Sequence, residues 1–187
     1  MKKVLLVLLL ALISATGAYA QFSVGKYTKF PNNKLGGNTW KPALAFARDG
    51  SKDMLVLYVN QNSDYAQFDA ESRLLVKFEN DSTYKLPILM EYGVEKDYDS
   101  SYNKFSGVVT EYSTYTCYDV TKDFVNSIIN DGVLIKKIRI VFTNGTVADY
   151  DIDKGYMKKL TKGLQESYKK MEKKQEQQQK NMNDEDF

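Results

Sequence analysis

The stretch that decides the fold class is KIRIVFTNGTVADYDI, residues 137–152. Apolar and polar side chains alternate on both sides of the Asn144-Gly145 pair. Alternation with a period of two is typical of strands with one buried face, and an Asn-Gly pair between two such runs is a strong hairpin signal. The stretch therefore predicts two antiparallel strands joined by a tight turn.

The register of this hairpin follows from the requirement that both faces be consistent. A two-residue loop would place Asp149 opposite Ile140, with an acid on the apolar face. A three-residue loop that ends at a left-handed Gly145 pairs Ile140 with Ala148 instead, and Arg139 then faces Asp149. We therefore predict the three-residue loop.

Two further hairpins precede this one. Alternating apolar residues flank Asp49-Gly50, and a second pair of alternating runs flanks residues 80–82. The hairpins around residues 80–82 and 144–146 match one another at a spacing of 64 residues. Internal duplication and convergence on the same turn chemistry both explain that similarity.

Two helices complete the predicted order of elements. Residues 121–131 predict a short helix capped by Thr121, and a longer helix begins after Asp153. The longer helix has one apolar stripe, formed by Met157, Leu160, Leu164, Tyr168 and Met171. The stripe gives way to Gln and Lys, so residues 176–187 are expected to be a polar, disordered tail. We predict one α+β domain over residues 21–175, mainly antiparallel sheet and either sandwich-like or partly closed.

Residues 1–20 have the pattern of a secretory signal peptide. Two lysines precede an apolar run over residues 4–13, and Ala18-Tyr19-Ala20 offers small residues at both cleavage positions. An apolar run of ten residues is too short to cross a membrane. We expect cleavage after Ala20 and a periplasmic or secreted protein.

The charge of the mature chain argues against nucleic acid as a partner. Loss of the two signal-peptide lysines leaves 24 basic and 24 acidic side chains, so no broad basic face is expected. Only residues 154–180 are basic, with nine lysines against three glutamates.

Several kinds of catalytic and metal site are excluded by composition. The chain has no histidine and a single cysteine, Cys117, so it contains no Ser-His-Asp set, no His-ligated zinc site and no intrachain disulfide. Asp97 and Asp99 imitate the start of a calcium loop, but Tyr102 stands where such a loop needs glycine. We predict no metal and no cofactor.

The segment from Tyr92 to Tyr118 is the richest in aromatic and acidic side chains. Aromatic rings that combine apolar area with a polar tip are suited to stacking on sugars or to lining a protein contact. The candidate ligand-binding residues are Trp40, Tyr92, Tyr98, Tyr102, Tyr112 and Tyr115. Half-buried tyrosine within a sheet is the structural alternative for the same residues.

One resemblance accompanies these patterns over about residues 70–170. A strand from Gly132-Val133 into Lys137-Ile138, an Asn-Gly turn and a basic C-terminal helix resemble small uncharacterised exported proteins of Bacteroidetes type. The resemblance implies an envelope or secreted location and carries no known active site. A lipocalin-like barrel is the second possibility, because Gly37 and Trp40 precede the strands.

The function expected from the sequence is that of an exported, non-catalytic binding protein whose partner is a protein or glycan of the cell envelope. The alternatives are a carboxylate-dependent glycan hydrolase and a lipocalin-like carrier of small ligands. A pocket with two facing carboxylates beside aromatic rings would favour the hydrolase. A sheet face with exposed aromatic rings would favour the binding protein.

Overall fold

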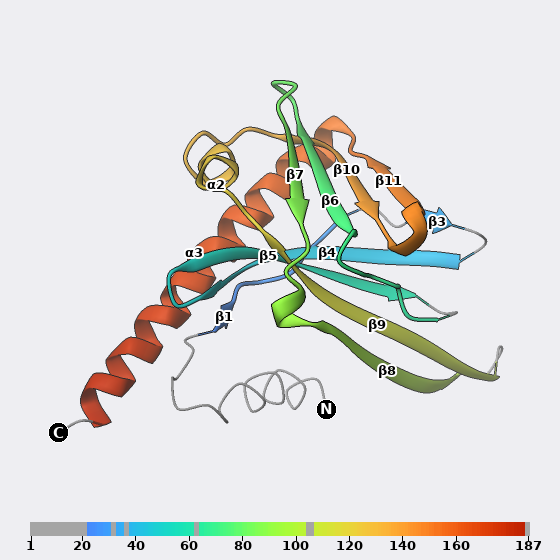
Figure 1. Ribbon diagram of the computed structural model, residues 1–187, viewed down its shortest axis with the longest axis horizontal. Helices are drawn as coiled ribbons and strands as arrows, with labels where there is room; N and C mark the ends of the chain where they lie inside the picture. Colours follow the sequence, from blue (N-terminus) through green and yellow to red (C-terminus); the bar gives the residue numbers. More distant parts are fainter. Residues whose placement is uncertain (1–21, 31–32, 36–37, 62–63, 104–106, 186–187) are drawn as a thin grey trace.

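The computed structural model describes residues 22–30, 33–35, 38–61, 64–103 and 107–185 (Figure 1). This part of the chain forms two antiparallel sheets, two α-helices and two short 3-10 turns. The fold is α+β and mainly antiparallel, as the hairpin patterns predict. The larger sheet curls into a half-barrel, and the smaller sheet lies across it (Figure 1).

The larger sheet has the strand order β1-β4-β5-β9-β8, and two more short strands, β2 and β3, also pair with β4. Its strands are β1 (Ser23–Val24), β2 (Thr28–Lys29), β3 (Asn33–Leu35), β4 (Asn38–Asp49), β5 (Lys52–Gln61), β8 (Val94–Asn103) and β9 (Gly107–Asp119). The β4–β5 hairpin turns at Gly50, whose φ is +56°. Because β8 is last in the strand order, it forms one edge of the described sheet.

The smaller sheet has the order β11-β10-β6-β7 and is built from the other two predicted hairpins. Its strands are β6 (Arg73–Phe78), β7 (Thr83–Pro87), β10 (Ile135–Val141) and β11 (Val147–Asp151). In the central pair, Leu74 faces Ile140 and Val76 faces Ile138. Leu74 and Val76 correspond to Ile138 and Ile140 at the spacing of 64 residues, so each residue faces the counterpart of the other. The two similar hairpins are therefore paired symmetrically.

The β10–β11 hairpin has the predicted three-residue loop. Ile140 faces Ala148 and Arg139 faces Asp149, and a 3-10 turn, η2 (Thr143–Gly145), joins the strands. Gly145 is left-handed with φ +71°. The Arg139 guanidinium donates to both Asp149 oxygens, at 2.6 and 2.7 Å, so the charged face is paired as the register requires.

The helices also begin where the sequence predicts. Thr121 caps α2 (Lys122–Ile129) by accepting a hydrogen bond from the Phe124 amide. Asp153 precedes α3 (Lys154–Glu185), and its side chain accepts from the Tyr156 amide at 2.9 Å. A second 3-10 turn, η1 (Met90–Tyr92), leads into β8.

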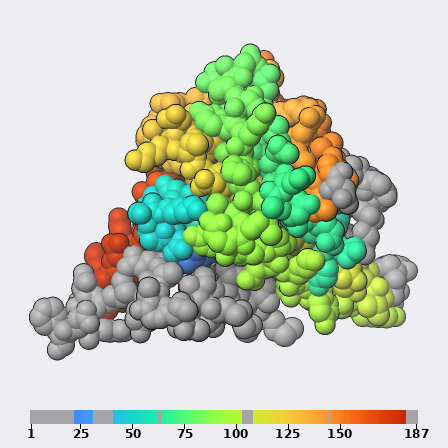
Figure 2. Space-filling model, viewed as in Figure 1, coloured from blue at the N-terminus to red at the C-terminus, as the bar shows by residue number. Residues whose placement is uncertain are grey.

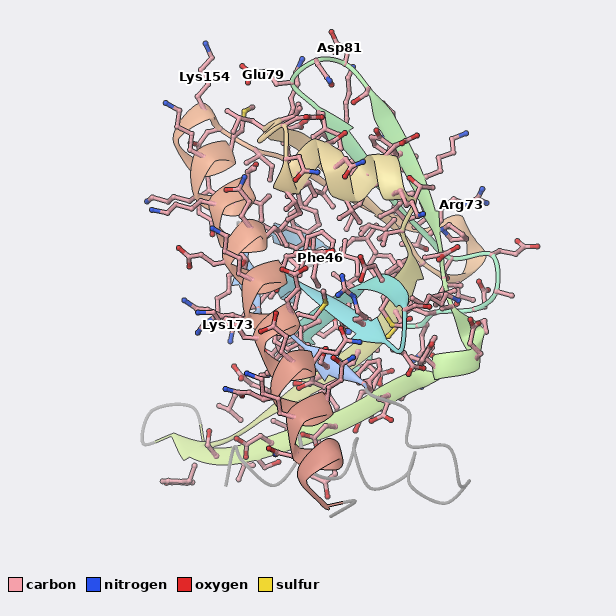
Figure 3. The ribbon with its side chains drawn as sticks, turned by 90° about the vertical axis from the view of Figure 1, so that its left-hand side faces the viewer. Phe46, Arg73, Glu79, Asp81, Lys154 and Lys173 are labelled. Atoms are coloured by element: carbon pink, nitrogen blue, oxygen red, sulfur yellow. The ribbon has the colours of Figure 1, made fainter. Side chains whose placement is uncertain are left out.

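The main core lies between the two sheets, α2 and α3. The predicted stripe of α3 is buried there, and Leu160, Leu164 and Met171 have no exposed surface. Phe46 of β4 lies in the interior beside α3 (Figure 3). α3 lies close to β4, and the Phe46 amide donates a hydrogen bond to the Ser167 hydroxyl across 3.0 Å.

A second, smaller cluster packs on the other face of the larger sheet. It contains Phe22, Met54, Val56, Leu89 and Cys117 among its buried members. Residues that alternate along β5 therefore divide between two apolar clusters. The larger sheet is buried on both faces over this region.

The end of α3 differs from the sequence expectation of a disordered tail over residues 176–187. The helix continues to Glu185, because Gln, Lys and Glu are good helix formers even without an apolar stripe. Polar contacts also hold α3 beyond the stripe: Gln175 accepts a hydrogen bond from Arg48 at 3.1 Å and donates to the Gly50 carbonyl. Lys173 projects from the outer side of this helix (Figure 3).

Candidate functional site

The β8–β9 ribbon extends beyond the rest of the larger sheet. β8 and β9 pair from Val94–Thr116 out to Asn103–Gly107, whereas β5 pairs with β9 only as far as Tyr112. The outer part of the ribbon is therefore two-stranded in the described structure. It forms a lower corner of the molecule in the space-filling view, well away from α2 (Figure 2).

One face of this ribbon carries exposed aromatic and apolar side chains, which we call the tyrosine strip. Its members are Tyr98, Tyr102, Val108 and Tyr112. In the strand register Tyr98 faces Tyr112 and Tyr102 faces Val108, so all four share one face. Tyr98 is 64% exposed, Tyr102 78% and Val108 72%. These are the largest exposed fractions among the big apolar side chains of the described residues.

The tyrosine strip continues towards the body of the protein. The ring of Tyr65 lies edge-on to Tyr112, with centroids 5.0 Å apart. The Lys96 ammonium lies 5.5 Å from the centre of the Tyr65 ring, at a distance suited to a cation–π contact. One end of the strip is thus fixed by packing, while Tyr98 and Tyr102 stay open to solvent.

The opposite face of the larger sheet carries a different group, which we call the tyrosine trio: Tyr27, Tyr58 and Tyr115. Tyr58 and Tyr115 are cross-strand neighbours with centroids 4.9 Å apart. Tyr27, from the segment between β1 and β2, approaches both rings at 5.9 and 6.4 Å. Burial, assisted by the nearby Tyr58, Asp97 and Glu95, raises the pKa of Tyr115 to about 12.

Tyr92 lies apart from both groups. Its hydroxyl donates to Asp49 at 2.9 Å, and its ring packs 6.0 Å from Phe22. Burial raises its pKa, and the hydrogen bond to the Asp49 carboxylate adds to that effect. Tyr92 therefore joins the end of β4 to the second cluster.

The six residues expected to form a ligand platform are thus distributed over several places. Tyr98, Tyr102 and Tyr112 belong to the tyrosine strip, whereas Tyr115 lies on the opposite face. Trp40 stands in β4 opposite Asn33, and its side chain lies outside the described part of the structure. Sequence reasoning missed Val108 and Tyr65. Val108 joins the strip through its pairing with Tyr102, and Tyr65 is brought to it by its ring contact with Tyr112.

Cys117 is a buried thiol of the second cluster. It is 8% exposed, and burial, assisted by the charges of Glu95 and Glu91, raises its pKa to about 12. A thiol with so high a pKa is almost entirely protonated at neutral pH and is a poor nucleophile.

A pocket of about 420 Å³ lies where the β4–β5 turn meets the end of β9 and the start of α2. Asp53 and Asp119 both line it, together with Tyr168 of α3. Both Asp53 oxygens accept hydrogen bonds from Arg48, and Oδ2 also accepts from the Tyr168 hydroxyl at 3.1 Å. The lone pairs of Asp53 are therefore engaged in joining α3 to the β4–β5 hairpin.

In the described ranges, no three acidic or cysteine side chains lie close enough together to hold a metal ion. None of the helices described is both long and apolar enough to cross a membrane. Comparison with known proteins finds no match, whether to family models, to curated proteins or to solved structures.

Proposed function

We propose that this chain is an exported, non-catalytic binding protein that contacts a protein or glycan of the cell envelope through the tyrosine strip. The proposal includes removal of residues 1–20, for which the lysine pair, the apolar run and the Ala-Tyr-Ala end of that segment are the support. N-terminal sequencing of the exported protein should begin at Gln21. Retention of Met1 on most of the protein would contradict the export step.

The observation that carries the proposal is the exposure of three neighbouring side chains on one face of a projecting ribbon. Tyr98, Tyr102 and Val108 are each more than 60% exposed. Exposed apolar side chains that are grouped rather than scattered mark interaction sites. Tyrosine is enriched in such contacts because a rigid ring gives a large contact area and its hydroxyl stays hydrogen-bonded.

The pocket beside Tyr168 also supports a non-catalytic function. A glycan hydrolase needs two carboxylates with oxygens free to take or give a proton. Asp53 has its oxygens engaged by Arg48 and Tyr168, which suits a structural ion pair. The tyrosine strip, by contrast, leaves the side chains of Tyr98, Tyr102 and Val108 largely exposed.

The proposal is tested by capture experiments with the mature protein, residues 21–187. Immobilised wild type and a Tyr98→Ser/Tyr102→Ser variant are compared on the native envelope fraction, and both are applied to a glycan array. We expect the variant to capture at least tenfold less of the partner than the wild type, because the two rings supply most of the open contact area. Both proteins should melt at the same temperature, since these side chains are exposed.

A matched control removes two exposed apolar side chains elsewhere. Met90 is 44% exposed and Val147 is 40% exposed, and neither belongs to the ribbon. Met90→Ser/Val147→Ser should capture the same partner as the wild type. Equal capture by the strip variant and this control variant would show that the strip is not the contact surface.

A further inference from the structure

Three carboxylates stand without a partner on the face of the larger sheet that carries the tyrosine trio. Glu95, Asp97 and Asp99 alternate along β8 and therefore share this face. Within the described residues, none of them makes an ion pair or a hydrogen bond. Their neighbours do: Glu111 binds Lys41, and Glu91 binds Lys52 at 2.9 Å. Lys41 faces Asn60 on this same side of the sheet and offsets the charge of Glu111. The three β8 carboxylates therefore leave a net negative charge along the edge strand.

The tyrosine trio lies directly beside these acids. Tyr115 is the cross-strand partner of Glu95, and the three rings are inclined to one another at 42–64°. A cation is attracted to the face of an aromatic ring. Carboxylates next to tyrosine rings therefore favour a positively charged group on this face.

A buried amide on the same face also needs a hydrogen-bond donor. Asn60 is 5% exposed, and its Nδ2 donates to the Ser113 hydroxyl at 3.2 Å. The Tyr58 hydroxyl lies at 3.2 Å from the same oxygen, and Ser113 faces Asp97 across the strands. The Asn60 Oδ1 atom has no partner. A buried acceptor without a donor is costly, so it marks a place for an incoming N–H group.

The protonation behaviour of the surrounding groups agrees with this geometry. Burial raises the pKa of Glu95, since partial removal from water disfavours its charged form. The charges of Asp97 and Glu95 contribute to the raised pKa of Tyr115. The two pKa shifts thus reflect partial burial at Glu95 and Tyr115 and the negative charge beside Tyr115.

We propose that this face binds a guanidinium group, as an arginine side chain presents it. A guanidinium is planar and always charged, it stacks on aromatic rings, and it donates several N–H groups in a fixed fork. Those properties match the tyrosine trio, the carboxylates of Glu95 and Asp97, and the free Asn60 oxygen together. A lysine ammonium matches the charge but offers no flat surface to stack. This site lies on the opposite face from the tyrosine strip, so the proposal goes beyond the proposed function.

The site is tested by NMR titration of the mature protein, residues 21–187, with small probes. N-acetyl-arginine amide should bind saturably with a Kd on the order of 1 mM, since one side chain supplies only part of an interface. N-acetyl-citrulline amide has nearly the same shape without charge and should bind at least tenfold more weakly. N-acetyl-lysine amide should bind about fivefold more weakly, because it cannot stack. Equal binding of the arginine and citrulline probes, or no saturable arginine binding, would overturn the proposal.

Free L-arginine separates the two possible sources of the group. If free L-arginine binds no better than N-acetyl-arginine amide, the site binds an arginine side chain within a protein chain. If it binds tenfold or more tightly, the site takes the free amino acid. Either result supports guanidinium recognition.

Charge-neutral variants connect the binding to the acids. Glu95→Gln/Asp97→Asn should weaken the arginine probe at least tenfold while leaving the melting temperature unchanged. Glu79→Gln/Asp131→Asn changes the net charge equally at exposed positions. Glu79 lies at the opposite end of the molecule from β8 (Figure 3), so this control should bind like the wild type. If both variants bound the arginine probe equally weakly, net charge alone would account for the effect, and the proposed site would be overturned.

The Tyr98→Ser/Tyr102→Ser variant keeps the two proposals distinguishable. It should lose the envelope partner and retain the arginine probe, because its two substitutions lie on the other face. Loss of probe binding in this variant would overturn the assignment of the site to the trio face.

Discussion

Replacing Leu160 of α3 by alanine measures how much the helix contributes to the core. Leu160 has no exposed surface and lies in the main cluster with Leu164 and Met171. The substitution removes three carbons, which corresponds to about 2.4 kcal/mol at ~0.8 kcal/mol for each buried group. The cavity that remains adds roughly 1–2 kcal/mol at about 24 cal/mol per Å³. We therefore expect a loss of about 3.4–4.4 kcal/mol in the free energy of unfolding.

The measurement is equilibrium unfolding of residues 21–187 in urea, with Lys159→Ala as the control. Lys159 is exposed on the same helix, so its truncation should change stability by less than about 0.5 kcal/mol. Leu160→Ala should lower the midpoint with an unchanged slope. The melting temperature should fall by roughly 7–18 °C for a chain of this size. A loss below about 1 kcal/mol would refute the packing of α3 against the sheets.

Three further predictions concern backbone strain, the helix end and the buried thiol. Gly145→Ala should lower the free energy of unfolding in urea by about 1 kcal/mol, because the φ of residue 145 is +71°. The added Cβ would meet no atom within 4 Å, so the cost comes only from the left-handed backbone. An unchanged midpoint would contradict the turn geometry. Deleting residues 176–187 should leave the unfolding midpoint almost unchanged. Deleting residues 173–187 should lower it, because Lys174 then loses its contact with Val24 and Gln175 its contact with Gly50. Equal effects of the two deletions would place the end of helix packing elsewhere. Cys117 should resist iodoacetamide at pH 8 in the folded protein and react in urea, since burial raises its pKa to about 12; fast alkylation of the folded chain would contradict its burial.

The hairpins were predictable from sequence because their determinants are local. The loop length at Asn144-Gly145 followed from requiring Ile140 and Asp149 to lie on different faces, and the structure confirms that register. The caps at Thr121 and Asp153 followed from side chains that satisfy free helix amides within three residues. Interactions between residues close in sequence depend little on the rest of the fold.

The continuation of α3 was less predictable because distant residues anchor it. The loss of the apolar stripe suggested a disordered tail from residue 176, whereas the helix continues to Glu185. Just before that point, Gln175 is bound to Arg48 and to the Gly50 carbonyl. Those partners come from a hairpin more than 120 residues away in sequence. No local pattern identifies such an anchor.

By itself, the sequence determined the antiparallel hairpins, both helix starts, the buried stripe of α3 and the absence of histidine chemistry. Only the tertiary structure decided which aromatic residues act together. The register of β8 with β9 places Tyr112 beside Tyr98 and Val108 beside Tyr102 on one face, and the pairing of β9 with the distant β5 joins Tyr115 to Tyr58 and Tyr27 on the other. Because successive side chains of a strand point to opposite faces, neighbours in sequence separate, and residues from three different strands or loops meet to form each surface.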